Sequence, residues 1–179
     1  EHYHDYCAIE DFQDQWQVEN CRLANLPDLS QENSWVTEQL YNWLNWLVKE
    51  YNFDGLRIDT VLHVPKWFWS GFSESAGVFT LGEAFNSNPS YVGGYQECLD
   101  GLLNYPLYFK IKSAFCGSMY DLERYIYEDR VAYYNPEYFG VFVDNHDNPR
   151  FLHDCGDRKK FRNALVFSLM YEGIPVYYY

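Results

Sequence analysis

The sequence predicts an α/β fold in which apolar strands alternate with helices, and three observations support this prediction. First, short apolar runs bounded by turn residues alternate with runs of helical periodicity, the pattern of βα units around a parallel sheet. Second, the acidic residues Asp59, Glu83 and Asp147 each end a different apolar run. Third, no run is followed by a glycine-rich phosphate-binding turn. These features favour part of a barrel of eight βα units over an open doubly wound sheet, because such barrels assemble their chemistry at the carboxyl ends of the strands.

The elements can be placed in order along the chain. Residues 1–34 are rich in Asp, Asn and Gln and show weak periodicity, so we expect a segment dominated by loops. Residues 35–50 carry apolar side chains at helical spacing, which predicts an amphipathic helix. The expected elements that follow are a strand over 53–59, a helix within 64–76, a strand over 77–85, a short strand continuing into a helix over 98–109, a helix over 118–129, a strand over 138–147, a helix over 158–172 and a last strand over 173–179.

Composition and charge exclude several classes of partner. The 179 residues include 13 Lys and Arg against 26 Asp and Glu, a net charge of −13, and this argues against nucleic acid because phosphates need clustered basic side chains. No apolar run is long enough to cross a bilayer, so we expect no membrane partner. The first residues do not resemble a signal peptide and both ends look cut, so we expect a piece of a larger protein.

The aromatic content, 21% of residues, supports a packed core and also suits stacking on flat ligands such as sugars or bases. Five cysteines are present without any CxxC pair, which argues against a zinc site of the usual spacing. Their odd number leaves one thiol over or one partner outside the chain.

Arg57 and Asp59 stand at alternate positions within one apolar strand, so their side chains project from the same face. Burying two such charges without partners costs several kcal/mol. The two side chains must therefore be paired with each other, solvated or functional. Three carboxylates at three strand ends suit glycosyl transfer, in which one carboxylate attacks the sugar carbon and one protonated acid donates to the leaving oxygen. For any one of these acids taken alone, a helix cap or a surface charge is the better explanation.

The segments around these acids remove that ambiguity. "GLRIDTVLHV", "LGEAF" and "FVDNHDNPRF" occur in this order and resemble the second, third and fourth signature segments of the alpha-amylase family, glycoside hydrolase family thirteen. "LPDLS", "LNYPLYF" and "GIPVYY" resemble further family segments, closest to the fungal-type secreted enzymes. The resemblance covers nearly the whole chain. It implies a partial (β/α)8 TIM barrel covering roughly strands 4–8, with residues 1–34 as the end of a domain B-like calcium-binding loop segment and residues 35–179 as the C-terminal part of the catalytic barrel.

The resemblance also assigns the acids. Asp59 corresponds to the nucleophile that forms a covalent glycosyl-enzyme, and Glu83 to the general acid that later activates water as a base. Asp147 corresponds to the residue that binds hydroxyl groups of the distorted sugar ring and helps to keep Glu83 protonated. Arg57 is then the partner that orients Asp59, and the charged pair is functional.

Further residues are assigned in the same way. By resemblance, His146 hydrogen-bonds a sugar hydroxyl, and the side chain of His63 faces the substrate while its backbone carbonyl binds a structural Ca²⁺. Glu19 and Asp28 match calcium ligands of the family, and ligation by oxygen alone suits that ion. The alternative for both acids is that they are ordinary loop charges.

Cys7 and Cys21 match a family disulfide, which implies an oxidising compartment, so the expected location is secreted or vacuolar and lysosomal. A pairing of Cys98 with Cys116 stays open, and Cys155 is left unassigned.

The resemblance implies retaining endo-hydrolysis of α-1,4 bonds in starch, glycogen and related α-glucan polysaccharides by an enzyme that is monomeric at full length. The alternatives are a transglycosylase or α-glucosidase of the same family, or a non-catalytic carbohydrate-binding relative, against which the three intact acids argue. Leu62 replaces a Lys of many relatives, which leaves the product pattern open. Because strands 1–3 and the C-terminal β-domain are missing, the open barrel of this isolated chain is expected to be inactive or nearly so.

Overall fold

The computed structural model describes the backbone of residues 1–179 and every side chain except that of Asp121. The chain folds into two compact units. The first comprises Glu1–Ala84 and Glu97–Asp100, and the second comprises Phe85–Gln96 and Gly101–Tyr179. Among the helices described, none is both long and apolar enough to cross a membrane.

The elements of the first unit follow the predicted order, with strands shorter than expected. Residues 1–34 are mostly loop, as predicted, and the helices at 35–50 and 64–76 and the strands at 53–59 and 77–85 are confirmed. Their observed bounds are α1 Gln15–Asn20, η1 Leu23–Asn25, α2 Ser34–Tyr51, β1 Gly55–Ile58, η2 Val61–His63, α3 Lys66–Ala76 and β2 Phe79–Gly82.

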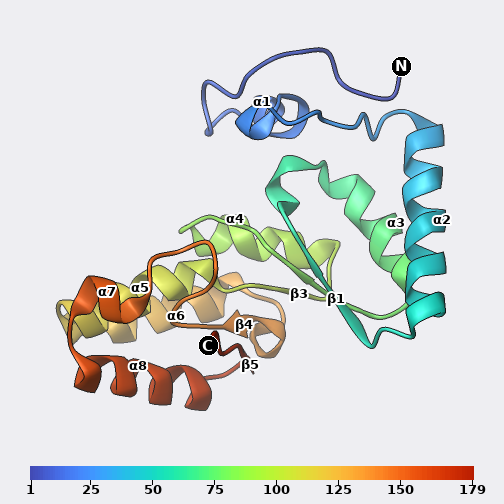
Figure 1. Ribbon diagram of the computed structural model, residues 1–179. Helices are drawn as coiled ribbons and strands as arrows, with labels where there is room; N and C mark the ends of the chain where they lie inside the picture. Colours follow the sequence, from blue (N-terminus) through green and yellow to red (C-terminus); the bar gives the residue numbers. More distant parts are fainter. The chain divides into compact units, whose positions relative to one another are not determined.

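Strands β1 and β2 are parallel, as the alternation of strands and helices predicts, with Gly55 opposite Phe79 and Ile58 opposite Gly82. Helices α2 and α3 pack side by side (Figure 1). The Tyr41 hydroxyl donates to the Phe68 carbonyl at 2.7 Å, which ties the two helices together. Their apolar faces share one core with the strands, formed by Leu44, Val48 and Ala76 with Leu56, Phe72 and Val78 packed against them.

The N-terminal loop segment is held by a disulfide and by short backbone pairings. The predicted Cys7–Cys21 disulfide is confirmed. The His4 amide donates to the Asp28 carbonyl at 3.0 Å beside an antiparallel bridge between Tyr3 and Leu29. These bonds fix the backbone around Asp28, one of the predicted calcium ligands.

The second unit contains short strands and longer helices. Strands β4 and β5 are parallel, and a parallel bridge joins Leu103 to Gly140. Helices α5 and α8 pack together over a core of Leu107, Ile111, Val141, Val143, Phe151 and Ala164. The bounds of the elements are α4 Pro89–Gly93, η3 Gly94–Glu97, β3 Gly101–Leu102, α5 Tyr105–Cys116, η4 Met119–Asp121, α6 Leu122–Ala132, η5 Pro136–Tyr138, β4 Gly140–Val141, α7 Phe151–Cys155, α8 Arg158–Met170 and β5 Ile174–Pro175.

The strand expected over 138–147 is reduced to two residues, Gly140–Val141. Phe142 and Val143 stay buried, at 1% and 4% exposed, so the apolar pattern reports burial correctly. Further along, the polar residues bond locally, with the Asp147 amide donating to the Asn145 side chain at 3.1 Å.

The possible pairing of Cys98 with Cys116 is not the one that the structure shows. Cys116 forms a disulfide with Cys155, joining the ends of α5 and α7 with Cα atoms 5.2 Å apart. Cys98 belongs to neither disulfide and is buried, and burial raises the pKa of its thiol to about 11. The pattern of cysteines alone could not decide this, because the contact brings together residues 39 positions apart.

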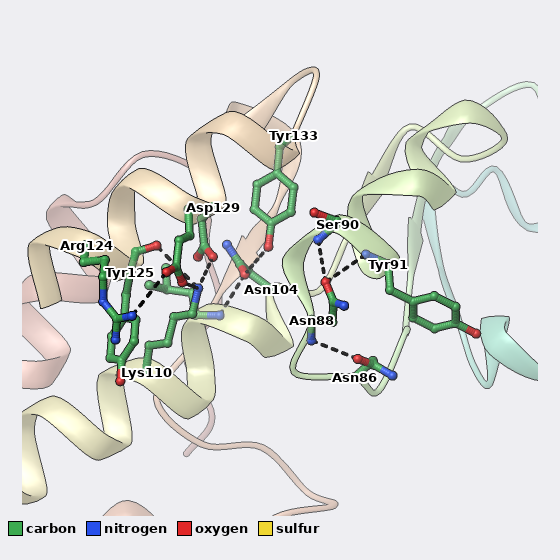
Figure 2. Close-up of polar contacts among 12 residues, drawn as sticks. Asn86, Asn88, Ser90, Tyr91, Asn104, Lys110, Arg124, Tyr125, Asp129 and Tyr133 are labelled. Carbon is green, nitrogen blue, oxygen red and sulfur yellow. Dashed lines mark hydrogen bonds and ion pairs between the residues drawn. The ribbon is translucent and has the colours of Figure 1, made fainter. Parts of the chain in front are cut away.

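A buried ion pair links α5 to α6 (Figure 2). The ammonium of Lys110 donates to Asp129 at 2.6 Å, and both side chains are at most 10% exposed. Nearby, the Tyr133 hydroxyl donates to Asn104, whose side chain also accepts from the Leu107 amide and caps α5.

Candidate active site

Asp59 and Glu83 directly follow the last paired residues of two neighbouring parallel strands, Ile58 of β1 and Gly82 of β2. Neighbouring strands lie about 4.8 Å apart, so the two acids occupy adjacent positions at one carboxyl edge. The structure therefore brings together the two acids that the sequence predicts as nucleophile and general acid.

Glu83 is fixed by three hydrogen bonds to the last residue of β1 and the segment that follows it. Its amide donates to the Ile58 carbonyl at 2.7 Å, and its carbonyl accepts from the Val61 amide at 2.9 Å. Its carboxylate oxygen Oε2 accepts from the Thr60 amide at 3.1 Å. Only 7% of Glu83 is exposed, so one carboxylate oxygen has a fixed donor in a largely buried setting.

Thr60 supplies that donor from an unusual backbone conformation, φ 48° and ψ 39°. A β-branched residue rarely adopts left-handed φ and ψ, and such strain costs about 1–3 kcal/mol. The turn aims the Thr60 amide at Glu83. Backbone strain is thus located between the two acids.

Arg57 on β1 forms an ion pair with Asp59, the residue directly after the strand, through Nη1 and Oδ1, as the family resemblance implies. The Arg57 side chain is 33% exposed and the Asp59 side chain is 68% exposed. The two charges are therefore paired with each other and partly solvated. The Asp59 carboxylate is the more accessible of the two groups and is open to a ligand.

His63 lies at the end of η2, next to the N-terminal loop segment. Its Nδ1 donates to the Val18 carbonyl at 3.1 Å. Burial lowers the pKa of His63, while the bond to Val18 and the carboxylate of Asp28 oppose this effect. The Trp69 indole fixes the same turn by donating to the Val61 carbonyl at 2.9 Å.

The three predicted calcium ligands share one neighbourhood. Helix α1, which contains Glu19, packs against η2, which contains His63, and Asp28 is close enough to His63 to affect its pKa. Two carboxylates and a carbonyl fit calcium in donor type, but they are fewer than the six to eight oxygens that the ion takes. Among the described side chains, no three His, Cys, Asp or Glu residues form a metal-binding group.

The carboxylates of this neighbourhood have protein partners. Glu19 accepts from the Gln15 side chain at 2.6 Å, and Asp28 bonds His4 at 2.7 Å. Although burial opposes it, hydrogen bonds to Asp28 and Glu32 raise the pKa of His4. A cation would therefore have to compete with His4 for Asp28.

Asp147 and His146 belong to the second unit, in the segment between β4 and α7. Nε2 of His146 lies 3.2 Å from Oδ2 of Asp147, and both side chains are about half exposed. The Asn145 side chain holds this segment. Its Oδ1 accepts from the Asp147 amide at 3.1 Å and from Asn148 at 2.8 Å, and its Nδ2 donates to the Tyr105 hydroxyl at 2.8 Å.

Two residues that position the candidate site were not predicted from the sequence. Thr60 acts through its backbone amide, so its side chain gives no signal. Tyr105 lies 40 positions before Asn145, and its apolar neighbours indicate only a core residue.

The family comparison agrees with this arrangement. The model of the alpha-amylase catalytic domain ("Alpha amylase, catalytic domain") matches residues 6–179.

The chain belongs to the alpha-amylase family.

Its similarity to curated and solved alpha-amylases is moderate in sequence and high in structure. The chain is 39% identical over 186 residues to alpha-amylase 1 of Lipomyces kononenkoae, an alignment that covers 100% of the chain and 30% of that protein. An alpha-amylase structure from Malbranchea cinnamomea matches 97% of the chain and 38% of its own length, with 38% identity and a TM-score of 0.93. A solved cyclomaltodextrin glucanotransferase, CldA, matches 99% of the chain and 38% of its own length, with 27% identity and a TM-score of 0.92.

These matches confirm the predicted α/β fold as part of the alpha-amylase TIM barrel. The chain spans 30% of the Lipomyces alpha-amylase and 38% of each of the two solved structures.

Proposed function

We propose that the protein containing this chain hydrolyses internal α-1,4 bonds of starch, glycogen and related α-glucans with retention of configuration. The observation that carries the proposal is the pair of carboxylates at adjacent positions directly after β1 and β2. Asp59 is open to a ligand and paired with Arg57, whereas Glu83 is 7% exposed and bonded to the Thr60 amide. One exposed anion beside one shielded acid suits the two roles of a retaining glycosidase.

In this reaction Asp59 attacks the anomeric carbon, and the bond to the leaving oxygen breaks as that oxygen takes a proton from Glu83. Glu83, now a carboxylate, removes a proton from water as the water attacks the same carbon and releases Asp59. Arg57 keeps Asp59 oriented and compensates its charge. The Thr60 amide holds Oε2 of Glu83 in place and so orients the carboxyl group for proton transfer.

The remaining predicted residues bind the sugar. Asp147 accepts hydrogen bonds from sugar hydroxyls, and His146 donates one to the ring that reacts. His63 presents its Nε2 to substrate, because its Nδ1 is used by the Val18 carbonyl. The family pattern supports these three assignments residue by residue.

The proposal also includes a structural calcium ion held by Glu19, Asp28 and the His63 carbonyl, with water and other oxygen donors completing its coordination. The ion would join the N-terminal loop segment to the turn after β1. In the same proposal, residues 1–34 end a domain B-like region, residues 35–179 belong to the catalytic barrel, the full-length protein is a monomer, and the two disulfides fit secretion or a vacuolar and lysosomal location.

The calcium assignment predicts that Asp28→Asn weakens calcium binding at least about tenfold, because the substitution removes a charged oxygen ligand. Isothermal titration of calcium into the protein measures this directly and needs no activity. Asp5→Asn is the matched control, since Asp5 is an exposed acid of the same loop. Equal affinity in all three proteins would remove Asp28 from the site.

Release of reducing ends from soluble starch tests the function, in the longest natural polypeptide that carries this chain. Asp59→Asn and Glu83→Gln should each lower kcat by about a thousandfold or more, because each removes a group that exchanges a bond or a proton. Asp54→Asn, at an exposed acid just before β1, should leave kcat unchanged. NMR of the first product should show the α-anomer. Starch binding without hydrolysis in the unaltered protein would instead support the non-catalytic relative.

A second candidate, transglycosylation of α-glucans, is favoured by the similarity to the glucanotransferase. It uses the same acids and differs in the acceptor that replaces water. Chromatography of products from maltoheptaose distinguishes the two, since a transglycosylase yields chains longer than the substrate.

A further inference from the structure

The turn after β1, residues 60–63, carries backbone strain next to the candidate acid Glu83. Thr60 has φ 48° and ψ 39°, a left-handed conformation that a β-branched residue adopts at a cost of about 1–3 kcal/mol. In the same unit, α2 ends in the left-handed Asn52, but Asn is a residue type that tolerates this conformation. Thr60 has no such preference, so the contacts around it must impose its conformation.

Hydrogen bonds to the neighbouring residues of the turn hold Thr60 in this conformation. The Val61 amide donates to the Glu83 carbonyl at 2.9 Å. The Val61 carbonyl accepts from a side chain, the indole Nε1 of Trp69, at 2.9 Å. Both polar backbone groups of Val61 are therefore bonded, one to the residue after β2 and one to α3. Val61 is 0% exposed and Trp69 is 5% exposed, so the indole bond is shielded from water.

The Trp69 indole is itself held in one orientation by packing. It makes edge-on contacts with Phe68 and Phe72 of α3, with ring centroids 5.3 and 5.4 Å apart. The Tyr41 hydroxyl of α2 bonds the Phe68 carbonyl at 2.7 Å and fixes this part of α3. A donor held by its surroundings loses little freedom when it bonds, so the indole N–H is well placed to hold the Val61 carbonyl.

We propose that Trp69 is a positioning residue for Glu83 and acts through the turn after β1. Its N–H holds Val61, which keeps Thr60 left-handed. The Thr60 amide then donates to Oε2 of Glu83 at 3.1 Å. Without the indole N–H, the turn relaxes to a less strained conformation and the Thr60 amide moves away from the carboxyl group. The inference rests on the proposed function, because it concerns the proton that Glu83 gives to the leaving oxygen.

Two substrates distinguish a displaced acid from a general loss of structure. The sugar leaving group of maltoheptaose needs a proton as its bond breaks, whereas the fluoride of α-maltotriosyl fluoride leaves without one. Displacement of Glu83 therefore lowers kcat/KM for maltoheptaose and leaves kcat/KM for the fluoride unchanged, while a disordered site lowers both. The quantity to measure is the ratio of the first kcat/KM to the second, in the longest natural polypeptide that carries this chain.

Two substitutions separate the hydrogen bond of Trp69 from its packing. Trp69→Phe keeps an aromatic ring and removes the N–H, so it should lower the ratio about tenfold, with kcat/KM for the fluoride within about twofold of the parent. Trp69→His removes the benzene ring and keeps a ring N–H, because Nε2 of His stands where Nε1 of Trp stands in the five-membered ring. It should lose more thermal stability than Trp69→Phe, since it leaves a larger cavity, and keep the ratio of the parent.

Trp67→Phe is the matched control for these variants. Trp67 lies on α3 two positions before Trp69 and is 53% exposed. Its substitution should change neither the ratio nor kcat/KM for the fluoride.

The role of backbone strain is tested in a Thr60→Gly background. Gly adopts left-handed φ without strain, so the turn no longer needs the indole bond, and adding Trp69→Phe should change the ratio by less than about twofold. An equal loss in the Thr and Gly backgrounds would mean that the indole acts by another route, and it would overturn the proposal.

The remaining outcomes are equally decisive. An unchanged ratio in Trp69→Phe overturns the proposal, and so does a larger fall of the ratio in Trp69→His, which would tie the ratio to packing. If one of these two variants does not fold, the other decides, since the proposal fixes the ratio expected of each. A parent protein that cleaves neither substrate would overturn the proposed function and this inference with it. A parent that cleaves both, with Trp69→Phe behaving as the parent does, would overturn this inference alone.

Discussion

The Asn145 side chain shows how a single amide can position the segment that contains Asp147. It bonds both the Asp147 amide and the Asn148 side chain, and it is itself held by the hydroxyl of Tyr105, a residue with no exposed surface. A buried aromatic residue thus fixes the backbone of an acid that is about half exposed. Positioning of this kind affects turnover because small misplacements of a substrate-binding group raise the barrier.

We predict that Tyr105→Phe lowers kcat on soluble starch about tenfold with KM within about twofold, because only the fixation of the Asp147 segment is lost. Tyr108→Phe is the control on the same helix, since the Tyr108 hydroxyl accepts a long bond, 3.5 Å, from the Lys112 ammonium. Steady-state kinetics of both variants decides the matter. An unchanged kcat in Tyr105→Phe would show that Asn145 holds the segment without help.

At the scale of single residues, the sequence predicts which charged side chains belong to the candidate site better than it predicts the groups that hold them in place. The alternate spacing of Arg57 and Asp59 places both side chains on one face but leaves pairing, solvation and a functional role open, and the family resemblance is what predicts the observed ion pair. Thr60 could not be predicted, since its contribution is a backbone amide in a strained conformation.

At the scale of elements, periodicity finds the long helices and misses the short ones. The helical spacing of Leu40, Leu44 and Leu47 predicts α2 to within a residue or two, and α8 is also found. Helix α4 was missed, although Asn88 followed by Pro89 is a helix-start signal. A segment of five residues is too short for periodicity to show.

A buried ion pair, Lys110 with Asp129, contributes to the contact between α5 and α6 (Figure 2). We predict that Lys110→Met destabilises the protein by about 3–5 kcal/mol, because the Asp129 carboxylate stays buried without its partner. Arg124→Met is the control, since the Arg124–Glu128 pair on α6 is exposed and 3.7 Å long, and its loss should cost less than about 1 kcal/mol. Urea denaturation of the three proteins measures both values.

The pH dependence of that variant has a definite sign. Burial raises the pKa of Asp129 above its ordinary value of 3.8, and Lys110 opposes the effect, so removing Lys110 raises the folded-state pKa further. A raised folded-state pKa destabilises the protein above that pKa, and the loss disappears as the pH falls towards the unfolded-state value. Lys110→Met should therefore approach the parent in stability as the medium is acidified. A difference that grows on acidification would contradict this reading.

At the scale of the whole molecule, the combined signature segments predict the family and fold correctly, because their order along the chain is specific although each is modest alone. The disulfides show the limit of that inference. Cys7–Cys21 matched a family pattern, whereas Cys116–Cys155 is a contact between helix ends that no local sequence feature encodes. Each disulfide lies within a different compact unit.

We predict that the Cys116→Ser/Cys155→Ser variant loses about 4 kcal/mol of unfolding free energy and the Cys7→Ser/Cys21→Ser variant about 3 kcal/mol, from sequence separations of 39 and 14 residues. Because the bridges lie in different units, the losses should add to within about 0.5 kcal/mol in the quadruple variant. Chemical denaturation under oxidising conditions provides all three values. If the quadruple variant were as stable as the less stable of the two double variants, the two disulfides would not stabilise the protein independently.

The hydrogen bond from the Thr60 amide to Glu83 has a consequence for the tolerance of this position to mutation. Since the donor is part of the main chain, exchanging the Thr60 side chain leaves the donor in place, and residues at ease with left-handed φ, such as Gly and Asn, would relieve strain without disturbing the acid. Proline alone removes the donor and cannot adopt this φ. Related proteins could therefore carry different small polar residues at position 60. A comparison of side chains would then not show that the position matters, and the only sign would be the absence of proline.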